Sequence, residues 1–161
     1  MGRLTFSRNR SSAATIEAHL RKCDADFSRS LSTRVSLREY AAKLASHAER
    51  SEAWAGTRLV GLVAMYPPSV SGECFISNVS VDPMFRRLGL GRHLLNDSID
   101  IALNLGAARL SLDVDVESQV AQHLYCSMGF DPVMGGPSRW VREFLYHPSL
   151  RRETEGFSSA D

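Results

Sequence analysis

The stretch that decides the fold runs from Asp82 to Leu95 and reads Asp-Pro-Met-Phe-Arg-Arg-Leu-Gly-Leu-Gly-Arg-His-Leu-Leu. Gly89 and Gly91 allow backbone N–H groups to approach a ligand closely, because neither carries a side chain. A helix is predicted to begin at about Leu90, and the positive end of its dipole points at the same loop. Three arginines add positive charge around this point, namely Arg86, Arg87 and Arg92. The stretch therefore predicts a binding site for a diphosphate.

Two commoner phosphate-binding loops do not fit this stretch. A dinucleotide fingerprint would need a third glycine where the chain has Leu94. A P-loop would need Gly-Lys-Ser/Thr, which is absent. The order of strand, Asp-Pro, arginine pair, Gly-x-Gly and helix remains as the distinctive feature.

The flanking segments predict a single α/β or α+β domain over residues 1–147. Leu59 to Tyr66 is almost wholly apolar, as expected of a strand covered on both faces, and Pro67-Pro68 ends it. Cys74 to Val81 is predicted to pair with it as a hairpin. Further strands are expected at 3–8, 52–55, 109–116, 130–134 and 139–146, and helices at 12–24, 36–50 and 90–105. A fourth helix is expected after Val116, with Ala121, Leu124, Tyr125 and Met128 on one face and Gly129 as its cap. Residues 148–161 are polar and without periodicity, and we expect them to be a disordered tail.

Composition limits the kinds of partner. The chain has 161 residues, 43% of them hydrophobic, and a formal net charge of +1, which favours neither nucleic acid nor acidic membranes. No apolar run has the length of a signal peptide core or a membrane span, so a cytoplasmic protein is expected. Three scattered cysteines (Cys23, Cys74 and Cys126) predict neither a zinc site nor a disulfide framework, and we expect no metal. We interpret all three as core or near-core residues.

The loop and the segment after it resemble the GNAT superfamily of N-acetyltransferases. The family signature Arg/Gln-x-x-Gly-x-Gly/Ala is matched by Arg86, Gly89 and Gly91. Downstream, the family has Asn-x-x-Ala-x-x-Leu-Tyr followed by Gly-Phe, and this chain has Ser118 where the family usually has Asn. The remaining positions match in order, namely Ala121, Leu124, Tyr125, Gly129 and Phe130. The resemblance implies a mixed, mostly antiparallel sheet of six to seven strands flanked by about four helices.

The resemblance also implies a site for acetyl-CoA as acyl donor. Acetyl-CoA would lie in an opening between the strand ending at Val81 and the strand ending at Val116. Backbone groups of Val79, Ser80 and Val81 would bind the pantetheine arm, with Ser118 reaching it less well than Asn would. The N–H groups from Arg87 to Arg92 would hold the diphosphate. The cofactor-binding residues of this loop would be Arg86, Arg87, Leu88, Gly89, Leu90, Gly91 and Arg92. A backbone N–H near Val81 is expected to stabilise the oxyanion, because strand distortion there would free it from the ladder.

Tyr125 is the candidate general acid, because it matches the tyrosine that approaches the CoA sulfur in the family. It would also contact the cofactor. Glu73 opens the strand next to the site and is the candidate base, acting through water. Asp113 and Asp115 share the polar face of the next strand and are further carboxylates to consider.

The acceptor is expected to be a primary amine of a small molecule, with an amino sugar or another small amine favoured. One alternative is a protein N-acetyltransferase acting on an N-terminus or a lysine, and another is a non-catalytic CoA-binding sensor. The family also allows a homodimer. The N-terminal helices and the last hairpin would wall the acceptor site, and the N-terminal part holds Phe27, Arg34, Arg38, Tyr40 and Trp54.

Overall fold

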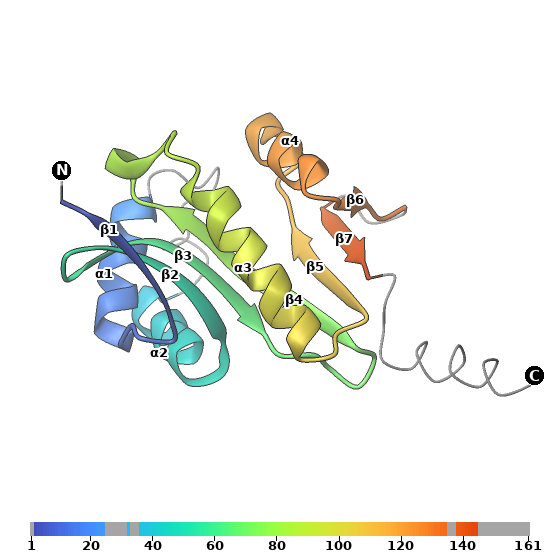
Figure 1. Ribbon diagram of the computed structural model, residues 1–161, viewed down its shortest axis with the longest axis horizontal. Coiled ribbons are helices and arrows are strands. Elements are labelled where there is room, and N and C mark those ends of the chain that lie inside the picture. The colour runs from blue at the N-terminus through green and yellow to red at the C-terminus, as the bar shows by residue number, and fades with distance from the viewer. Residues whose placement is uncertain (1, 25–31, 33–35, 135–137, 145–161) are drawn as a thin grey trace, which may run out of the picture.

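The computed structural model describes residues 2–24, 32, 36–134 and 138–144 (Figure 1). The N-terminal half contains β1 (Leu4–Arg8), α1 (Ala13–Cys23), α2 (Leu37–His47), β2 (Glu49–Ala55), β3 (Arg58–Tyr66) and β4 (Glu73–Val81). A short 3-10 turn, η3 (Pro83–Phe85), leads to α3 (Leu90–Asn104), β5 (Arg109–Asp113), α4 (Gln119–Ser127), β6 (Asp131–Pro132) and β7 (Arg139–Glu143). The tail expected at 148–161 lies outside the described residues.

One seven-stranded sheet forms the centre of the molecule, in the order β1-β2-β3-β4-β5-β7-β6. Neighbouring strands pair antiparallel, except that β4 and β5 are parallel. The predicted hairpin between the two apolar strands is β3–β4. The sequence-based expectation of a mixed, mostly antiparallel sheet with about four helices is therefore confirmed.

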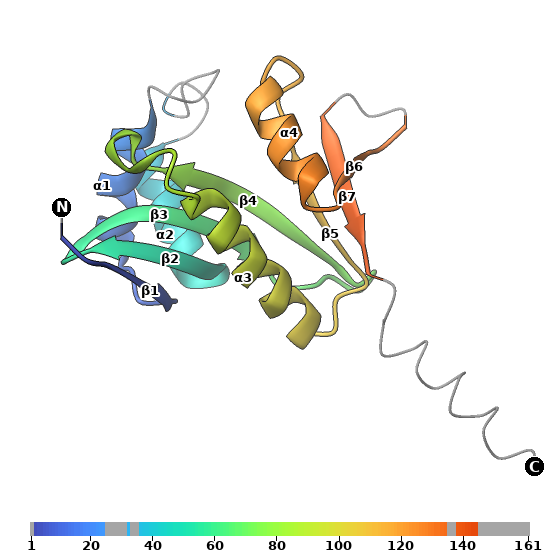
Figure 2. The same ribbon diagram turned by 45° about the horizontal axis from the view of Figure 1, so that its top comes forward.

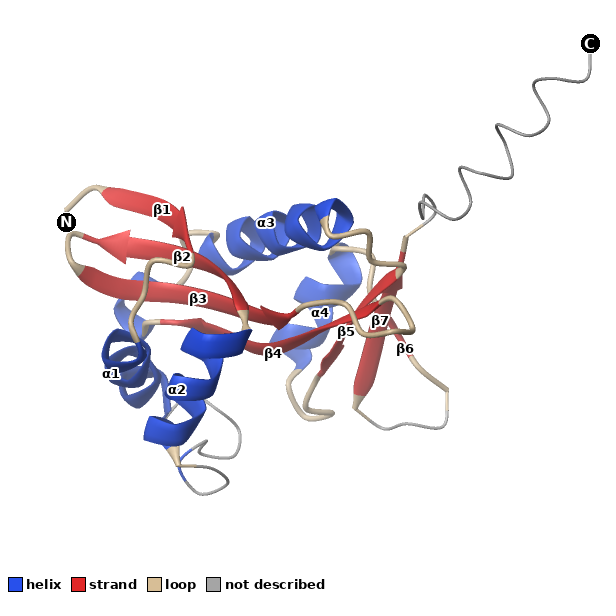
Figure 3. Ribbon diagram, turned by 90° about the horizontal axis from the view of Figure 1, so that it is seen from below, coloured by secondary structure: helices blue, strands red, loops and turns tan. Residues whose placement is uncertain are grey.

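The helices cover the two faces of this sheet in pairs (Figure 3). α1 and α2 lie on one face over the N-terminal strands, and their core includes Leu20, Leu44 and Leu62. α3 and α4 lie on the other face, where the core includes Leu94 and Leu110. Both faces of β3 are covered, which explains why nearly all of its residues are buried.

Two buried charges on β2 fix where α1 begins and α2 ends. The Arg50 guanidinium donates to three carbonyl oxygens in the last turn of α2 and after it, those of Leu44, Ala45 and Ala48, each at 3.1 Å. The Glu52 carboxylate is fully buried and accepts the N–H groups of Arg10 and Ser11 just before α1. Arg50 therefore satisfies carbonyl groups at the end of α2, and Glu52 satisfies two N–H groups of the segment that leads into α1.

Three expectations from the sequence are corrected. β5 ends at Asp113 rather than Val116, because Asp115 turns the chain by accepting the N–H groups of Glu117 and Ser118. The strand expected at 130–134 is reduced to Asp131–Pro132. Cys126 is exposed, whereas Cys23 and Cys74 are buried as expected. Within the described ranges, no helix is long and apolar enough to cross a membrane.

Candidate active site

The sheet opens between β4 and β5. The two strands are paired only from Glu73 opposite Arg109 to Ile76 opposite Leu112, and β4 then continues to Val81. Figure 2 shows the strands diverging toward their C-terminal ends, with α3 and α4 on either side of the gap. In the described part of the chain no other strand pairs with this side of β4 beyond Ile76. β4 therefore has an open hydrogen-bonding edge inside the molecule.

The pairing of β4 with β3 shows which backbone groups face this open edge. The N–H of Asp82 donates to the carbonyl of Val60 at 2.8 Å, so Asp82 faces β3. Successive residues of a strand direct their backbone groups to opposite sides, so Ser80 and Asn78 also face β3. Val79 and Val81 then direct an N–H and a C=O each toward the opening. These groups can bind an extended ligand as an added strand would be bound.

Two sequence-based expectations change at this point. Ser80 does not reach the open edge, since its backbone faces β3 and its hydroxyl is buried against His19. The strand distortion lies at Ser77 rather than near Val81: Ala64 pairs with Asn78 and Met65 with Ile76, which leaves Ser77 unpaired as a β-bulge. The candidate oxyanion donor is therefore moved to Val79, the first residue after the bulge whose N–H faces the opening.

The loop after β4 begins at Asp82, whose carboxylate is held by two hydrogen bonds. The Asp82 carboxylate accepts the Met84 N–H at 3.0 Å and the Arg58 guanidinium at 2.8 Å. Burial opposes ionisation of Asp82, but these two donors and the charge of Lys22 outweigh it and lower the pKa. Asp82 therefore shapes the loop, as a turn residue, and is not a candidate base.

The start of α3 fits a diphosphate. Gly89 is the N-cap with a φ of 75°, and no side chain accepts the N–H groups of the first turn. Those N–H groups belong to Leu90, Gly91 and Arg92, and they are the groups that an anion binds at a helix start. A Cβ on Gly89 would meet nothing within 4 Å, so the space in front of the helix is open.

The three arginines of the loop are placed differently. Arg86 and Arg87 are exposed, and Arg87 has a positive φ of 64°. The Arg92 guanidinium donates to the hydroxyl of Ser127 on α4 at 2.8 Å, so it joins the two helices beside the opening. The Leu88 side chain is also exposed. Arg92 can thus contribute its backbone N–H to a diphosphate while its side chain holds α4 in place.

Tyr125 lies on α4 and packs with its ring edge toward Phe130, at a centroid distance of 5.9 Å. Its side chain is 8% exposed, and burial raises the pKa of its phenol to about 12. Its hydroxyl makes no hydrogen bond with the described residues. None of the buried side-chain polar atoms in the described part of the chain lacks a partner, so the Tyr125 oxygen is not fully buried and retains access to solvent. The phenol therefore stays protonated at neutral pH, and its proton is not committed to a hydrogen bond with the described residues.

Ser118 is the N-cap of α4, and its hydroxyl makes no capping hydrogen bond. The residue is half-buried at the end of the segment that follows β5. Its hydroxyl is thus available for a ligand lying in the opening.

Two carboxylates lie on the face of the sheet opposite α3 and α4. Leu110 and Leu112 of β5 belong to the α3–α4 core, so Asp113 projects to the other face. The Arg139 guanidinium donates to Asp113 at 2.8 Å and lies 3.9 Å from Glu73. Asp113 lies where β4 and β5 separate, whereas Glu73 starts the paired segment. Asp113 therefore lies beside the opening, and Glu73, the carboxylate predicted from the sequence, lies at the far end of the paired segment.

The proposed acceptor walls are only partly supported. Trp54 is a core residue that donates its indole N–H to Ser7 at 2.8 Å, and Arg38 is exposed on α2. Tyr40 lies next to the opening of the sheet, where its hydroxyl contacts Ser77. Phe27 and Arg34 lie outside the described residues.

Three buried polar side chains are hydrogen-bonded in a row on the face of β4 that α1 covers. His19 is 2% exposed and lies 2.8 Å from the Ser80 hydroxyl and 3.2 Å from the Leu59 carbonyl oxygen. Ser80 is in turn 2.7 Å from the side-chain amide of Asn78. Burial is the main reason why the pKa of His19 falls to about 4, although both hydrogen bonds and the charge of Asp82 oppose this.

We expect the stability of the protein to fall on acidification because of His19. Its pKa is about 4 in the folded chain against an ordinary 6.5, so folding favours the neutral ring. The contribution is present above pH 6.5 and is lost as the pH falls toward 4, by about 3 kcal/mol. Urea unfolding between pH 7 and pH 4 measures this loss. His19→Gln should lower stability at pH 7 and flatten the pH dependence; an unchanged slope in the variant would contradict the assignment to His19.

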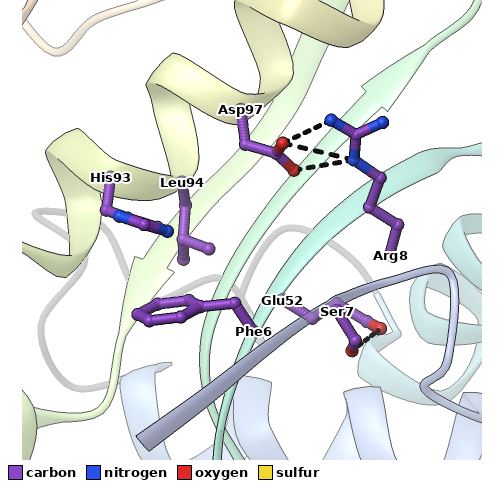
Figure 4. Close-up of a pocket in the computed structure, with 7 residues that line it drawn as sticks. All are labelled: Phe6, Ser7, Arg8, Glu52, His93, Leu94 and Asp97. Carbon is purple, nitrogen blue, oxygen red and sulfur yellow. Dashed lines mark hydrogen bonds and ion pairs between the residues drawn. The ribbon is translucent and has the colours of Figure 1, made fainter.

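A separate cavity of about 140 Å³ lies between β1 and α3 (Figure 4). An ion pair between Arg8 and Asp97 closes one side of it, and Phe6 stacks on His93 at a centroid distance of 4.0 Å. It is lined by residues of β1, β2 and α3, and the open edge of β4 does not contribute to it. This cavity therefore belongs to the scaffold and is not part of the opening between β4 and β5.

An open strand edge and an uncapped helix start lie beside each other, and both suit an extended ligand that carries a diphosphate. Residues 14–130 match the Acetyltransferase (GNAT) family model. The chain therefore belongs to the GNAT acetyltransferase family.

A curated relative resembles part of the chain in sequence, and solved structures resemble its fold. The [ribosomal protein bS18]-alanine N-acetyltransferase of Escherichia coli K12 is 42% identical over 62 residues, which are 38% of this chain and 42% of that protein. The chain thus spans less than half the length of this curated relative. The crystal structure of the Escherichia coli ribosomal-protein-S18-alanine N-acetyltransferase superposes with a TM-score of 0.67 at 21% identity, over 88% of this chain and 94% of that one. The crystal structure of the PaiA N-acetyltransferase of Thermoplasma acidophilum in complex with coenzyme A superposes with a TM-score of 0.69. Its sequence is 14% identical, and the match covers 87% of this chain and 99% of that one.

Proposed function

We propose that this chain acetylates the α-amino group at the N-terminus of a polypeptide. The single observation that carries the transferase part is the open edge of β4, with the uncapped start of α3 beside it. The polypeptide acceptor is supported by the curated relative that is named for the alanine of a ribosomal protein. The small amine expected from the sequence is the competing acceptor.

The residues of this chain would hold the donor in three places. The first-turn N–H groups from Leu90 to Arg92 would bind the diphosphate. The backbone of Val79 and Val81 would bind the pantetheine as an added strand, with the Ser118 hydroxyl opposite. Bound acetyl-CoA would supply an acetyl group activated as a thioester, and the Val79 N–H would be the donor available to its carbonyl.

Acid–base chemistry is divided between the two faces of the sheet. On the α4 side, Tyr125 would hold a proton at its phenolic oxygen for the departing sulfur. On the opposite face, Asp113 would accept the proton of the amine, directly or through water, while Arg139 fixes its position. Glu73 lies 3.9 Å from the same arginine, and it would accept the proton of the amine only over a longer distance than Asp113.

The acceptor proposal is tested by thiol release from acetyl-CoA with matched amine acceptors. One set contains short peptides with free N-termini, the same peptides with blocked N-termini, and peptides with an internal lysine. The other set contains amino sugars and small alkylamines. We expect release with the free-terminus peptides and none with their blocked forms. Release confined to the small amines would replace the polypeptide acceptor with the small-molecule one.

A chain that binds donor without transferring acetyl would behave differently. Acetyl-CoA would then raise the melting temperature, as any ligand of the folded state does, while no acceptor released thiol. That result would favour a CoA-binding sensor over both acceptors.

A further inference from the structure

Tyr40 contacts β4 at the position where that strand loses its β5 partner. It projects from α2 and is half-buried, and its hydroxyl lies 2.6 Å from the Ser77 hydroxyl and 3.0 Å from the Ser77 carbonyl oxygen. A phenol has one proton to donate, so donation to the carbonyl leaves its oxygen to accept from Ser77. Ser77 is the unpaired bulge residue and directly follows Ile76, the last residue paired with β5.

The bulge determines which backbone groups face the opening. In a regular strand every second residue directs its backbone groups to the same side. The residues after Ile76 that face the β5 side would then be Asn78 and Ser80. The extra residue at Ser77 shifts the alternation by one, so Val79 and Val81 face the opening instead. A one-residue shift also exchanges the two faces for every following side chain.

The side chains after the bulge are compatible with this register and not with the regular one. Val79 and Val81 pack against the core beneath α3 and α4. Asn78 and Ser80 are buried on the other face, in the polar chain that ends at His19. The regular register would place both polar side chains in an apolar core without partners, at a cost in free energy. Tyr40 therefore bonds the single residue on which this register depends.

We infer that Tyr40 is a positioning residue for acetyl transfer. Through Ser77 it holds the bulge and thereby directs the N–H groups of Val79 and Val81 at the donor. Tyr40 itself does not need to touch the donor. The inference rests on the proposed function, because it takes the open edge of β4 as the donor site.

The test compares Tyr40→Phe with the matched variant Tyr66→Phe. Tyr66 is also half-buried on the α2 side, where Lys43 lies over its ring, and its hydroxyl has no hydrogen bond to the described residues. Calorimetry with CoA and steady-state kinetics with acetyl-CoA would measure both variants, and thermal melting would report their stability. Tyr40→Phe should weaken CoA binding by about fivefold to tenfold, because both contacts of the phenol with Ser77 are lost and the bulge is held less firmly. Tyr66→Phe should leave CoA affinity unchanged.

The coupling with Ser77 sharpens this test. Ser77→Ala removes one of the two contacts with the phenol, so adding it to Tyr40→Phe should weaken CoA binding by less than the sum of the single effects. If Tyr40→Phe lowers the melting temperature while CoA affinity and kcat stay within twofold of the wild type, Tyr40 is merely structural and the inference fails. If the wild-type chain does not bind CoA, the proposed donor site fails with it.

Discussion

Replacing Gly89 by Glu is expected to abolish measurable CoA binding, with a rise in Kd of at least about 100-fold. The new carboxylate would lie in front of the uncapped start of α3, where the diphosphate is held. Two like charges about 4 Å apart repel by roughly 4 kcal/mol at the effective dielectric of a protein surface, which corresponds to a loss well beyond 100-fold. The carboxylate would also accept the helix N–H groups itself and compete with the ligand for them.

The matched control for this variant is Gly56→Glu in the turn between β2 and β3. Gly56 also has a positive φ, 62° against 75° for Gly89, and a Cβ at either glycine would meet nothing within 4 Å. Both substitutions therefore carry the same backbone strain, roughly 1 kcal/mol, and the same added charge. Isothermal calorimetry should show normal CoA affinity for Gly56→Glu only. If the two variants bind CoA with equal affinity, the loop before α3 does not bind the diphosphate.

The loop and its helix could be predicted because their chemistry is local. Gly-x-Gly, the preceding arginines and the following apolar periodicity all lie within one short segment, and α3 begins at Leu90 as expected. The alternation from Arg109 onward likewise predicted β5. It overestimated its length, because alternation continues in the sequence after Asp115 has already turned the chain.

The shape of the open edge could not be predicted in the same way. The apolar positions change phase between Ile76 and Val79, which is a trace of the bulge, but a single extra residue leaves no repeating pattern. The contact of Tyr40 with Ser77 joins residues far apart in the chain, and so does the contact of Arg139 with Asp113. Such pairs depend on how helices and strands meet, which local sequence does not encode.

Tyr125→Phe is expected to lower kcat by about 100-fold or more while leaving the Kd for acetyl-CoA nearly unchanged. Removal of a general acid typically costs a factor of this size. The ring would keep its packing against Phe130, and the hydroxyl has no partner in the described structure to lose. The melting temperature should therefore change little. Single-turnover acetyl transfer and calorimetry with CoA separate the chemical step from binding.

The raised pKa of Tyr125 gives an independent check on the same role. Burial brings its pKa to about 12, so the phenol stays protonated from neutral pH to well above pH 10. The wild-type rate should then show no loss assignable to Tyr125 below about pH 11, because the proton that the residue donates is still bound. A wild-type profile that falls with an apparent pKa near 10, together with its disappearance in Tyr125→Phe, would show a solvated phenol instead. If Tyr125→Phe retains the wild-type kcat, Tyr125 only packs against Phe130, and water supplies the proton that the departing sulfur needs.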